Sequence, residues 1–253
     1  KNGNLWYEER FIVVNNNLVS QGEENIISEK IISLFNHISK TNKLKSILGN
    51  KFITKLNFEK EWGLGSSSTF INNLAKWANV DPYKLLFSTF KGSGYDIACC
   101  DVNYPIIYNK IENSINVKKV DFNPPFLEHL FLIYLGKKQN TQTSIENYLK
   151  ISFDKKYVIE KINFITNEFI HCADLNYFEE LVEEHESIIS KVISIDPIQK
   201  STFNDYCDGK IKSLGSWGGD FILVTSREEN NLDYFKKKGF KNIFPLSEIT
   251  HIN

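Results

Sequence analysis

The residues best suited to chemistry lie in one short run, Gly63-Leu64-Gly65-Ser66-Ser67-Ser68-Thr69, which we call the glycine–serine run. Its glycines allow the backbone to approach a ligand closely. A helix is expected to begin at Ser66, and the free N–H groups and positive dipole end of a helix start favour a phosphate. Four hydroxyl groups add phosphate donors and hard oxygen ligands for Mg²⁺. The run predicts a site for a magnesium-bound triphosphate, formed by all seven residues.

Other phosphate-binding motifs do not fit this run. A Walker A loop ends in Gly-Lys-Ser/Thr, and the run has no lysine. A dinucleotide fingerprint has a third glycine, where this chain has Ser68. The HRD and DFG motifs of protein kinases occur nowhere in the sequence. The alternative that binds no ligand is a glycine turn followed by a helix with a serine cap.

Two later segments carry further candidates. In Gly92-Ser93-Gly94-Tyr95-Asp96 a carboxylate follows a glycine turn, where aspartate commonly caps a helix. The segment Leu214–Asp220 contains Gly215, Ser216, Trp217, Gly218 and Gly219 between two expected strands. It suits either a loop that lines a ligand site or a plain turn. Lys138 follows an expected buried strand and suits either an anionic substrate or a solvated turn.

Taken in order, these three segments resemble the signatures of the GHMP kinases. Gly63–Ser68 resembles the second signature, GLGSSA, and Gly92–Ala98 resembles the SGxD segment with the catalytic aspartate. Leu214–Asp220 resembles the glycine-rich third signature, although Trp217 stands where small residues are usual. The string Gly94–Ala98, GYDIA, is similar to one subgroup of mevalonate or phosphomevalonate kinase-like members. The resemblance runs from about Lys51 to the end of the chain.

The resemblance implies an enzyme that transfers the γ-phosphoryl group of ATP to an alcohol or phosphate of a small metabolite. Asp96 is then the general base, Ser67 the catalytic Mg²⁺ ligand, and ATP and Mg²⁺ the cofactors. The substrate contacts implied by the resemblance are Gly94, Tyr95, Gly215, Ser216, Trp217, Gly218, Gly219 and Lys138. No glutamate lies between Phe70 and Ile97 to serve as a second magnesium ligand.

Mevalonate or phosphomevalonate, for isoprenoid synthesis, is the preferred substrate on the subgroup resemblance. A sugar or homoserine is the alternative within the family. A non-catalytic relative that binds a nucleotide, and a decarboxylase of the diphosphomevalonate kind, stay open.

The elements that must position these residues indicate an α+β fold. Strands are expected at Leu5–Val14, Lys51–Phe58, Pro105–Ile111, Val117–Phe122, Leu130–Leu135 and Ile243–Leu246, and a hairpin at Lys212–Ser226. Helices are expected at Asn25–Ser39, Ser66–Ala78, Asp81–Phe90, Ser144–Leu149, Lys155–Phe169, Tyr177–Ile193, Pro197–Tyr206 and Leu232–Lys238. The family resemblance implies two domains: 1–123, like the second domain of ribosomal protein S5, and 124–253, ferredoxin-like. Asn123-Pro124-Pro125 marks the boundary.

The composition narrows the classes of partner and the cellular compartment to be expected. The formal charge of −1 speaks against a nucleic-acid partner, and no apolar run approaches the roughly 20 residues of a membrane span. Four cysteines without CxxC spacing suit a reduced cytoplasmic compartment. A small-molecule substrate is expected, and homodimer formation stays open. Because the chain lacks an initial Met and the first GHMP signature, we expect a segment to precede Lys1.

Overall fold

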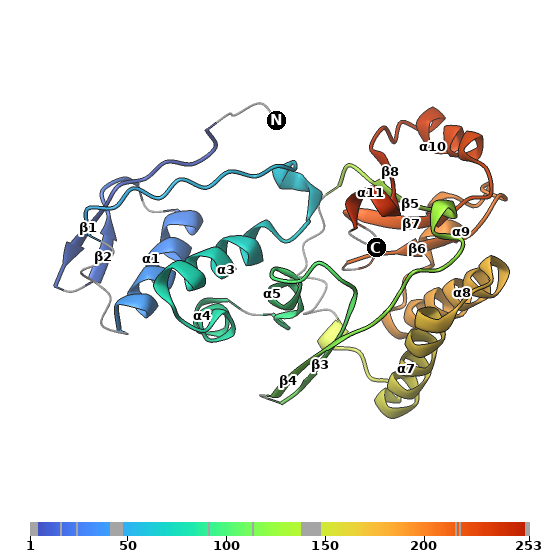
Figure 1. Ribbon diagram of the computed structural model, residues 1–253, viewed down its shortest axis with the longest axis horizontal. Helices are drawn as coiled ribbons and strands as arrows, with labels where there is room; N and C mark the ends of the chain where they lie inside the picture. Colours follow the sequence, from blue (N-terminus) through green and yellow to red (C-terminus); the bar gives the residue numbers. More distant parts are fainter. Residues whose placement is uncertain are drawn as a thin grey trace. The chain divides into compact units, whose positions relative to one another are not determined.

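The computed structural model describes residues 5–15, 17–23, 25–40, 48–90, 92–112, 114–137, 148–215, 217 and 219–250 (Figure 1). The chain divides into two compact units. Unit 1 contains Lys1–Lys60, Leu64–Val102 and Tyr108–Val117, and unit 2 contains Glu61–Gly63, Asn103–Ile107 and Lys118–Asn253. The last change from unit 1 to unit 2, between Val117 and Lys118, lies shortly before the expected domain boundary at Asn123.

The helices of unit 1 begin where their capping residues predict. Asn25 caps α1 (Ile26–Ile38) by accepting the N–H groups of Ile27 and Ser28, and Ser28 Oγ accepts the N–H of Asn25 in return. Asp81 caps α4 (Pro82–Thr89), with Pro82 at the first helical position. Between them lies α3 (Ser66–Ala78), which has the bounds that the sequence predicts.

One hydrophobic core joins these three helices (Figure 1). On α3, Ile71, Leu74, Ala75 and Ala78 recur at helical spacing and are buried. They pack with residues of α1 and α4, among them Leu34, Phe35, Ile38, Leu85 and Leu86. Burial of this stripe fixes how α3, and the run that leads into it, is turned within unit 1.

The strands of unit 1 form two short antiparallel ribbons. The first pairs β1 (Phe11–Val14) with β2 (Asn17–Ser20), so the expected strand over Leu5–Val14 forms only in its last four residues. The second pairs β3 (Ile106–Ile111) with β4 (Ser114–Lys119), and its residues divide between the two units.

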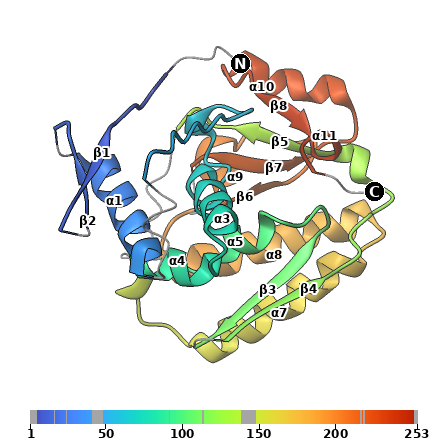
Figure 2. The same ribbon diagram turned by 60° about the vertical axis from the view of Figure 1, so that its left-hand side comes forward.

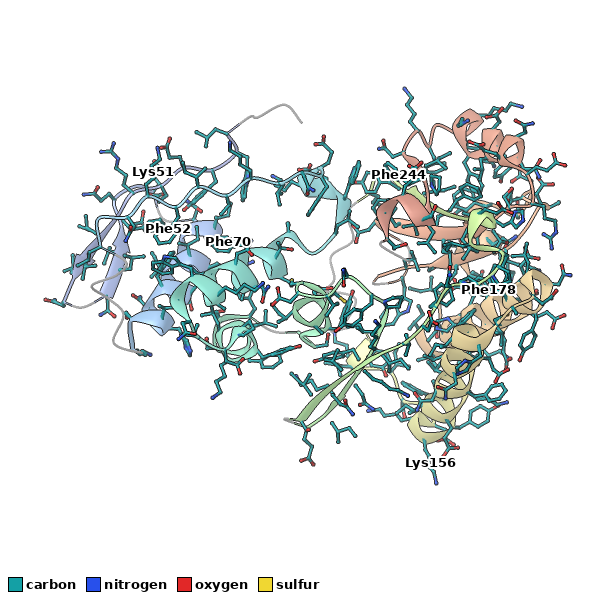
Figure 3. The ribbon with its side chains drawn as sticks, in the orientation of Figure 1. Lys51, Phe52, Phe70, Lys156, Phe178 and Phe244 are labelled. Atoms are coloured by element: carbon teal, nitrogen blue, oxygen red, sulfur yellow. The ribbon has the colours of Figure 1, made fainter. Side chains whose placement is uncertain are left out.

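The prediction of a strand at Lys51–Phe58 is wrong. These residues are assigned to no strand or helix. Phe52 instead packs its ring 5.2 Å from that of Phe35 and 4.8 Å from that of Trp77, measured between centroids (Figure 3). The alternating residues Phe52 and Leu56 remain exposed in the structure, at 41% and 39%, so the alternation reflects no buried face and no β-ladder.

Unit 2 is built on a four-stranded antiparallel sheet in the order β6-β7-β5-β8. The strands are β5 (Leu130–Tyr134), β6 (Ile211–Ser213), β7 (Phe221–Thr225) and β8 (Ile243–Pro245). Helices separate β5 from β6 and β7 from β8, which gives the βαββαβ succession and strand order of a ferredoxin-like fold. The C-terminal half therefore has the predicted topology.

Two long helices, α7 (Lys155–His171) and α8 (Leu175–Ile193), lie side by side in unit 2 (Figure 2). Phe178 of α8 packs against Phe169 of α7 and against Phe126 (Figure 3). The expected helix over Ser144–Leu149 falls largely outside the described residues. The remaining short helices are α5 (Tyr95–Cys99), α9 (Ile198–Thr202), α10 (Asp233–Lys237), α11 (Leu246–Ile249), η2 (Lys60–Trp62), η3 (Leu127–His129) and η4 (Glu229–Leu232).

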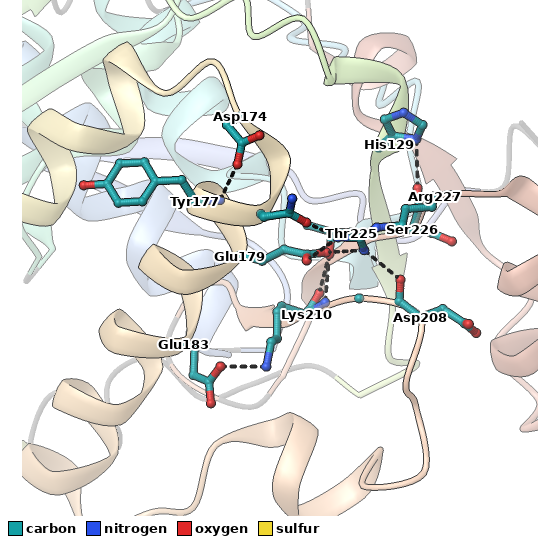
Figure 4. A network of polar contacts seen from close by, with 12 residues as sticks. His129, Asp174, Tyr177, Glu179, Glu183, Asp208, Lys210, Thr225, Ser226 and Arg227 are labelled. Carbon is teal, nitrogen blue, oxygen red and sulfur yellow. Dashed lines mark hydrogen bonds and ion pairs between the residues drawn. The ribbon is translucent and has the colours of Figure 1, made fainter.

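A polar network holds the end of β7 to α8 (Figure 4). The buried carboxylate of Glu179 accepts hydrogen bonds from the Thr225 hydroxyl and from both terminal nitrogens of Arg227. Thr225 Oγ1 in turn accepts the N–H of Lys210, at 2.7 Å. Because each of these groups is paired, we assign the network to stability. Within the described residues, no helix is both long and apolar enough to cross a membrane.

Candidate active site

The glycine–serine run leads into α3 through a left-handed glycine. Gly65 is the N-cap residue, with φ 72°, and no side chain caps the helix. The alternative of a serine-capped helix is therefore wrong. A left-handed N-cap suits glycine, because it has no Cβ to strain the backbone.

The first turn of α3 leaves three backbone donors unused. Within the part of the chain that the structure describes, the N–H groups of Ser66, Ser67 and Ser68 donate to no protein acceptor, and the first bond of the turn runs from Thr69 N to Gly65 O at 2.9 Å. Such N–H groups, with the helix dipole behind them, form an anion site. The Thr69 hydroxyl donates to Gly65 O instead, so it is not available as a phosphate donor.

Asp96 lies directly beside this turn, within unit 1. A Cβ built on Gly65 would stand 4.0 Å from both Cβ and Cγ of Asp96. Asp96 is the second residue of α5, whose N-cap is Gly94 in the left-handed region at φ 87°. The alternative role of Asp96 as a helix cap is therefore wrong, and its carboxylate is left for another purpose.

Contacts between α3 and α5 hold this arrangement. Asn72 of α3 is buried and donates to Asp101 Oδ1 at 2.7 Å, and Lys76 forms an ion pair with the same carboxylate. Cys100 Sγ donates to Asp96 O at 3.1 Å. The two helices are thus tied together just past the end of α5, and the position of Asp96 follows from that of α3.

The environment of Asp96 suits a base. Burial raises the pKa of its carboxyl group above the ordinary 3.8, and a hydrogen bond with Tyr95 opposes part of that rise. Enzymes raise carboxylate pKa values by burial in this way when the group must take up a proton near neutral pH.

The division between the units falls inside the run, between Gly63 and Leu64, and Gly63 packs within unit 2. A Cβ on Gly63 would meet Asp220 Cγ at 2.5 Å, and one on Gly215 would lie 3.9 Å from Asp220 Oδ2. The Asp220 backbone is fixed by bonds from Leu135 N and to Lys137 O, both 2.8 Å. The first glycine of the run therefore lies next to the third glycine-rich segment, through its contact with Asp220. Nothing in the spacing of the sequence motifs indicated this role for Asp220.

The other predicted residues fall in three groups. Gly94 is buried and Tyr95 is half exposed beside Asp96 in unit 1, and Leu64 is exposed. In unit 2, Gly219 is buried, and Trp217 has a left-handed backbone and packs its ring 5.9 Å from that of Tyr148. Ser216, Gly218 and Lys138 lie outside the described residues.

The oxygen groups at the start of α3 fit a magnesium nucleotide. Mg²⁺ is bound through one or two protein oxygens plus substrate phosphates rather than by an all-protein cage. The exposed Ser67 hydroxyl supplies such an oxygen beside the free N–H groups. Across the residues that the structure describes, no cluster of three or more His, Cys, Asp or Glu forms a metal cage.

A buried charged cluster lies just before the Gly215–Gly219 loop. Lys212 Nζ on β6 lies 2.9 Å from His185 Nδ1 on α8 and 3.5 Å from Glu186 Oε1. Burial lowers the pKa values of His185 and Lys212. Burial alone would raise the pKa of Glu186, but the charge of Lys212 and hydrogen bonds with Ser213 lower it. A neutral imidazole that accepts a hydrogen bond from Lys212 accounts for this geometry.

The cluster predicts that thermal stability falls between pH 7 and pH 5. Below the ordinary histidine pKa of 6.5, the unfolded chain takes up a proton that folded His185 resists, so protonation favours unfolding. We expect His185→Gln to flatten the Tm–pH profile, measured by differential scanning calorimetry. His171→Gln, at the exposed end of α7, is the control and should keep the wild-type slope. Equal slopes in all three proteins would contradict the assignment.

Comparisons identify the fold. A Lin0012 protein from Listeria innocua matches with a TM-score of 0.63 and 17% identity, over 90% of this chain and 84% of that one. The mevalonate kinase of Methanococcus jannaschii matches with a TM-score of 0.52 and 18% identity, over 93% of this chain and 83% of that one. The L. major mevalonate kinase, solved in complex with R-mevalonate, matches with a TM-score of 0.51 and 15% identity, over 72% of this chain and 64% of that one. No protein-family model and no curated protein matches the sequence. The chain therefore has the two-domain GHMP kinase fold.

Proposed function

We propose that this protein is an ATP-dependent kinase of a small metabolite, with its phosphate site at the start of α3. The observation that carries the proposal is the junction of three free N–H groups, at Ser66–Ser68, with the half-buried carboxylate of Asp96 beside Gly65. Phosphoryl transfer depends mainly on positioning and charge neutralisation, for which this junction provides both parts.

In this proposal each residue has a defined task. The N–H groups of Ser66, Ser67 and Ser68 bind phosphate oxygens, and the Ser67 hydroxyl holds Mg²⁺. Asp96 orients the acceptor hydroxyl and takes its proton as the new P–O bond forms and the bond to ADP breaks. The bound Mg²⁺ supplies charge neutralisation at the phosphates, and ATP supplies the phosphoryl group.

Mevalonate or phosphomevalonate is the acceptor that we propose. The GYDIA segment, Gly94–Ala98, and the fold shared with mevalonate kinases support this choice. We further propose that the protein acts in the cytoplasm and in isoprenoid synthesis. The remaining predicted contacts, Lys138 and the Gly215–Gly219 loop, are proposed to lie on the acceptor side.

A turnover assay tests the proposal. Purified protein is given ATP and Mg²⁺ with R-mevalonate, mevalonate 5-phosphate, homoserine or galactose, and ADP release is followed with a coupled enzyme. We expect acceptor-dependent ADP release with a mevalonate-type acid. Release with another alcohol would overturn the substrate, and release of CO₂ would indicate a decarboxylase. Stabilisation by MgATP without turnover of any alcohol would indicate a non-catalytic nucleotide-binding protein.

A further inference from the structure

We propose that Tyr108 is a positioning residue that holds the turn from which Asp96 projects; this inference rests on the proposed function. Asp96 lies on α5, which has only five residues and no side-chain cap. So short a helix has few hydrogen bonds of its own to fix its orientation. Contacts at both ends therefore set its direction: the bonds of Asp101 to α3 just after it, and contacts to the turn before it, Gly92–Gly94.

The Tyr108 hydroxyl makes the key contact. It donates to Ser93 O at 2.6 Å, from β3 to the turn, three residues before Asp96. Both residues lie in unit 1. This bond fixes the peptide plane between Ser93 and Gly94, and Gly94 is the N-cap residue of α5. Burial raises the pKa of Tyr108, so the phenol stays protonated and donates at every pH at which a carboxylate base would titrate.

Three aromatic side chains close around the same turn. A Cβ on the buried Gly94 would lie 3.0 Å from Phe87 Cζ, 3.3 Å from Tyr83 Cδ1 and 3.4 Å from the Tyr108 hydroxyl oxygen. Gly94 is thus pressed against rings from α4 and β3. Packing limits where the turn can move, and the Tyr108 bond selects its orientation within that limit.

The chain offers a matched control. Tyr83 contacts Gly94 through its ring, as Tyr108 does through its hydroxyl, but the Tyr83 hydroxyl bonds to none of the residues that the structure describes. Tyr83→Phe and Tyr108→Phe therefore each remove one phenol oxygen from a side chain that contacts Gly94. Only Tyr108→Phe removes a hydrogen bond to it.

The test compares the two variants in kinetics and in hydrogen exchange. We expect Tyr108→Phe to lower kcat by roughly 10- to 100-fold, because a misplacement of about 1 Å can cost about 10²-fold in rate. The KM for ATP should stay within about twofold, since α3 is untouched. Tyr83→Phe should keep kcat within about twofold of the wild type. Equal kcat values for the two variants, or a parallel rise in the KM for ATP, would overturn the inference.

Hydrogen exchange separates failure of this inference from failure of the proposed function. Amide exchange in the peptide Gly92–Cys100 should be faster in Tyr108→Phe than in Tyr83→Phe, with exchange in α3 unchanged. This measurement needs no turnover, so it stands even if the wild type phosphorylates no alcohol, which would sink the kinase proposal itself. Identical exchange in the two variants would show that Tyr108 does not hold the turn.

Discussion

Asp96→Asn is expected to lower kcat by at least about 10²-fold, with little change in the affinity for MgATP. An amide can still accept a hydrogen bond from the acceptor hydroxyl but cannot take its proton. The free N–H groups of Ser66–Ser68 remain as they are, so binding should persist. Steady-state kinetics with the best acceptor, beside calorimetric titration with MgATP, measure the two effects separately. Wild-type turnover in the variant would remove Asp96 from the mechanism.

The same substitution should raise thermal stability at pH 7. Because burial raises the pKa of Asp96 above 3.8, its contribution to stability is complete below that value and is lost as pH rises through the folded-state pKa. The amide of the variant never ionises, so the gain in Tm over wild type should shrink as the pH falls toward about 4. In the wild type, kcat/KM should fall with decreasing pH at a value above 3.8. Loss of activity together with gain of stability distinguishes a partly buried catalytic base from a structural carboxylate.

Gly63→Ala is expected to be the most damaging single-methyl change in the glycine–serine run. Gly63 has a φ of 70°, which costs a residue with a side chain about 1–2 kcal/mol. The new Cβ would also stand 2.5 Å from Asp220 Cγ, and overpacking of this kind costs about 1–3 kcal/mol. At roughly 2–4 °C per kcal/mol, the combined cost of about 2–5 kcal/mol should lower Tm by roughly 4–20 °C, measured by calorimetry.

Gly215→Ala separates the backbone strain from the clash. Its φ of 66° imposes similar strain, but its Cβ would lie 3.9 Å from Asp220, in ordinary contact. It should lower the free energy of unfolding by about 1–2 kcal/mol only. Because Asp220 itself has a φ of 53°, Asp220→Gly is also measured alone, and in the double-mutant cycle its recovery of stability should be larger in the Gly63→Ala background by the amount lost to the clash. Equal losses for the two alanine variants, or no recovery in the double variant, would show that Asp220 does not press on Gly63.

Local chemistry made much of the fold predictable from sequence. Asn25 and Asp81 are capping residues, and α1 and α4 begin directly after them. The apolar stripe on α3 needs helical spacing, so its bounds could be predicted. The structure of Lys51–Phe58 could not be predicted, because its alternation suggested a buried strand face, whereas Phe52 and Leu56 stay exposed and no neighbouring strand pairs with the segment in the described residues.

Motifs in the sequence indicated the candidate site but not its tertiary contacts. The residue types of the run and the order of the three segments indicated a phosphate site and a base. That Asp96 lies beside Gly65, that Asp220 lies against Gly63 and that Tyr108 bonds Ser93 are contacts between residues far apart in sequence. Only packing brings these pairs together, and no local preference specifies it.

The aromatic surroundings of Trp62 have a practical consequence. Its ring lies 6.2 Å from that of Tyr134, 6.1 Å from that of Phe221 and 5.2 Å from that of Phe244, and the next residue is Gly63. The fluorescence emission of an indole depends on such surroundings. Trp62 is therefore a natural fluorophore placed directly before the glycine–serine run. Under the proposed function, nucleotide titrations can be followed by intrinsic fluorescence without an attached dye, and the difference from a Trp62→Phe protein isolates the Trp62 signal from those of Trp6, Trp77 and Trp217.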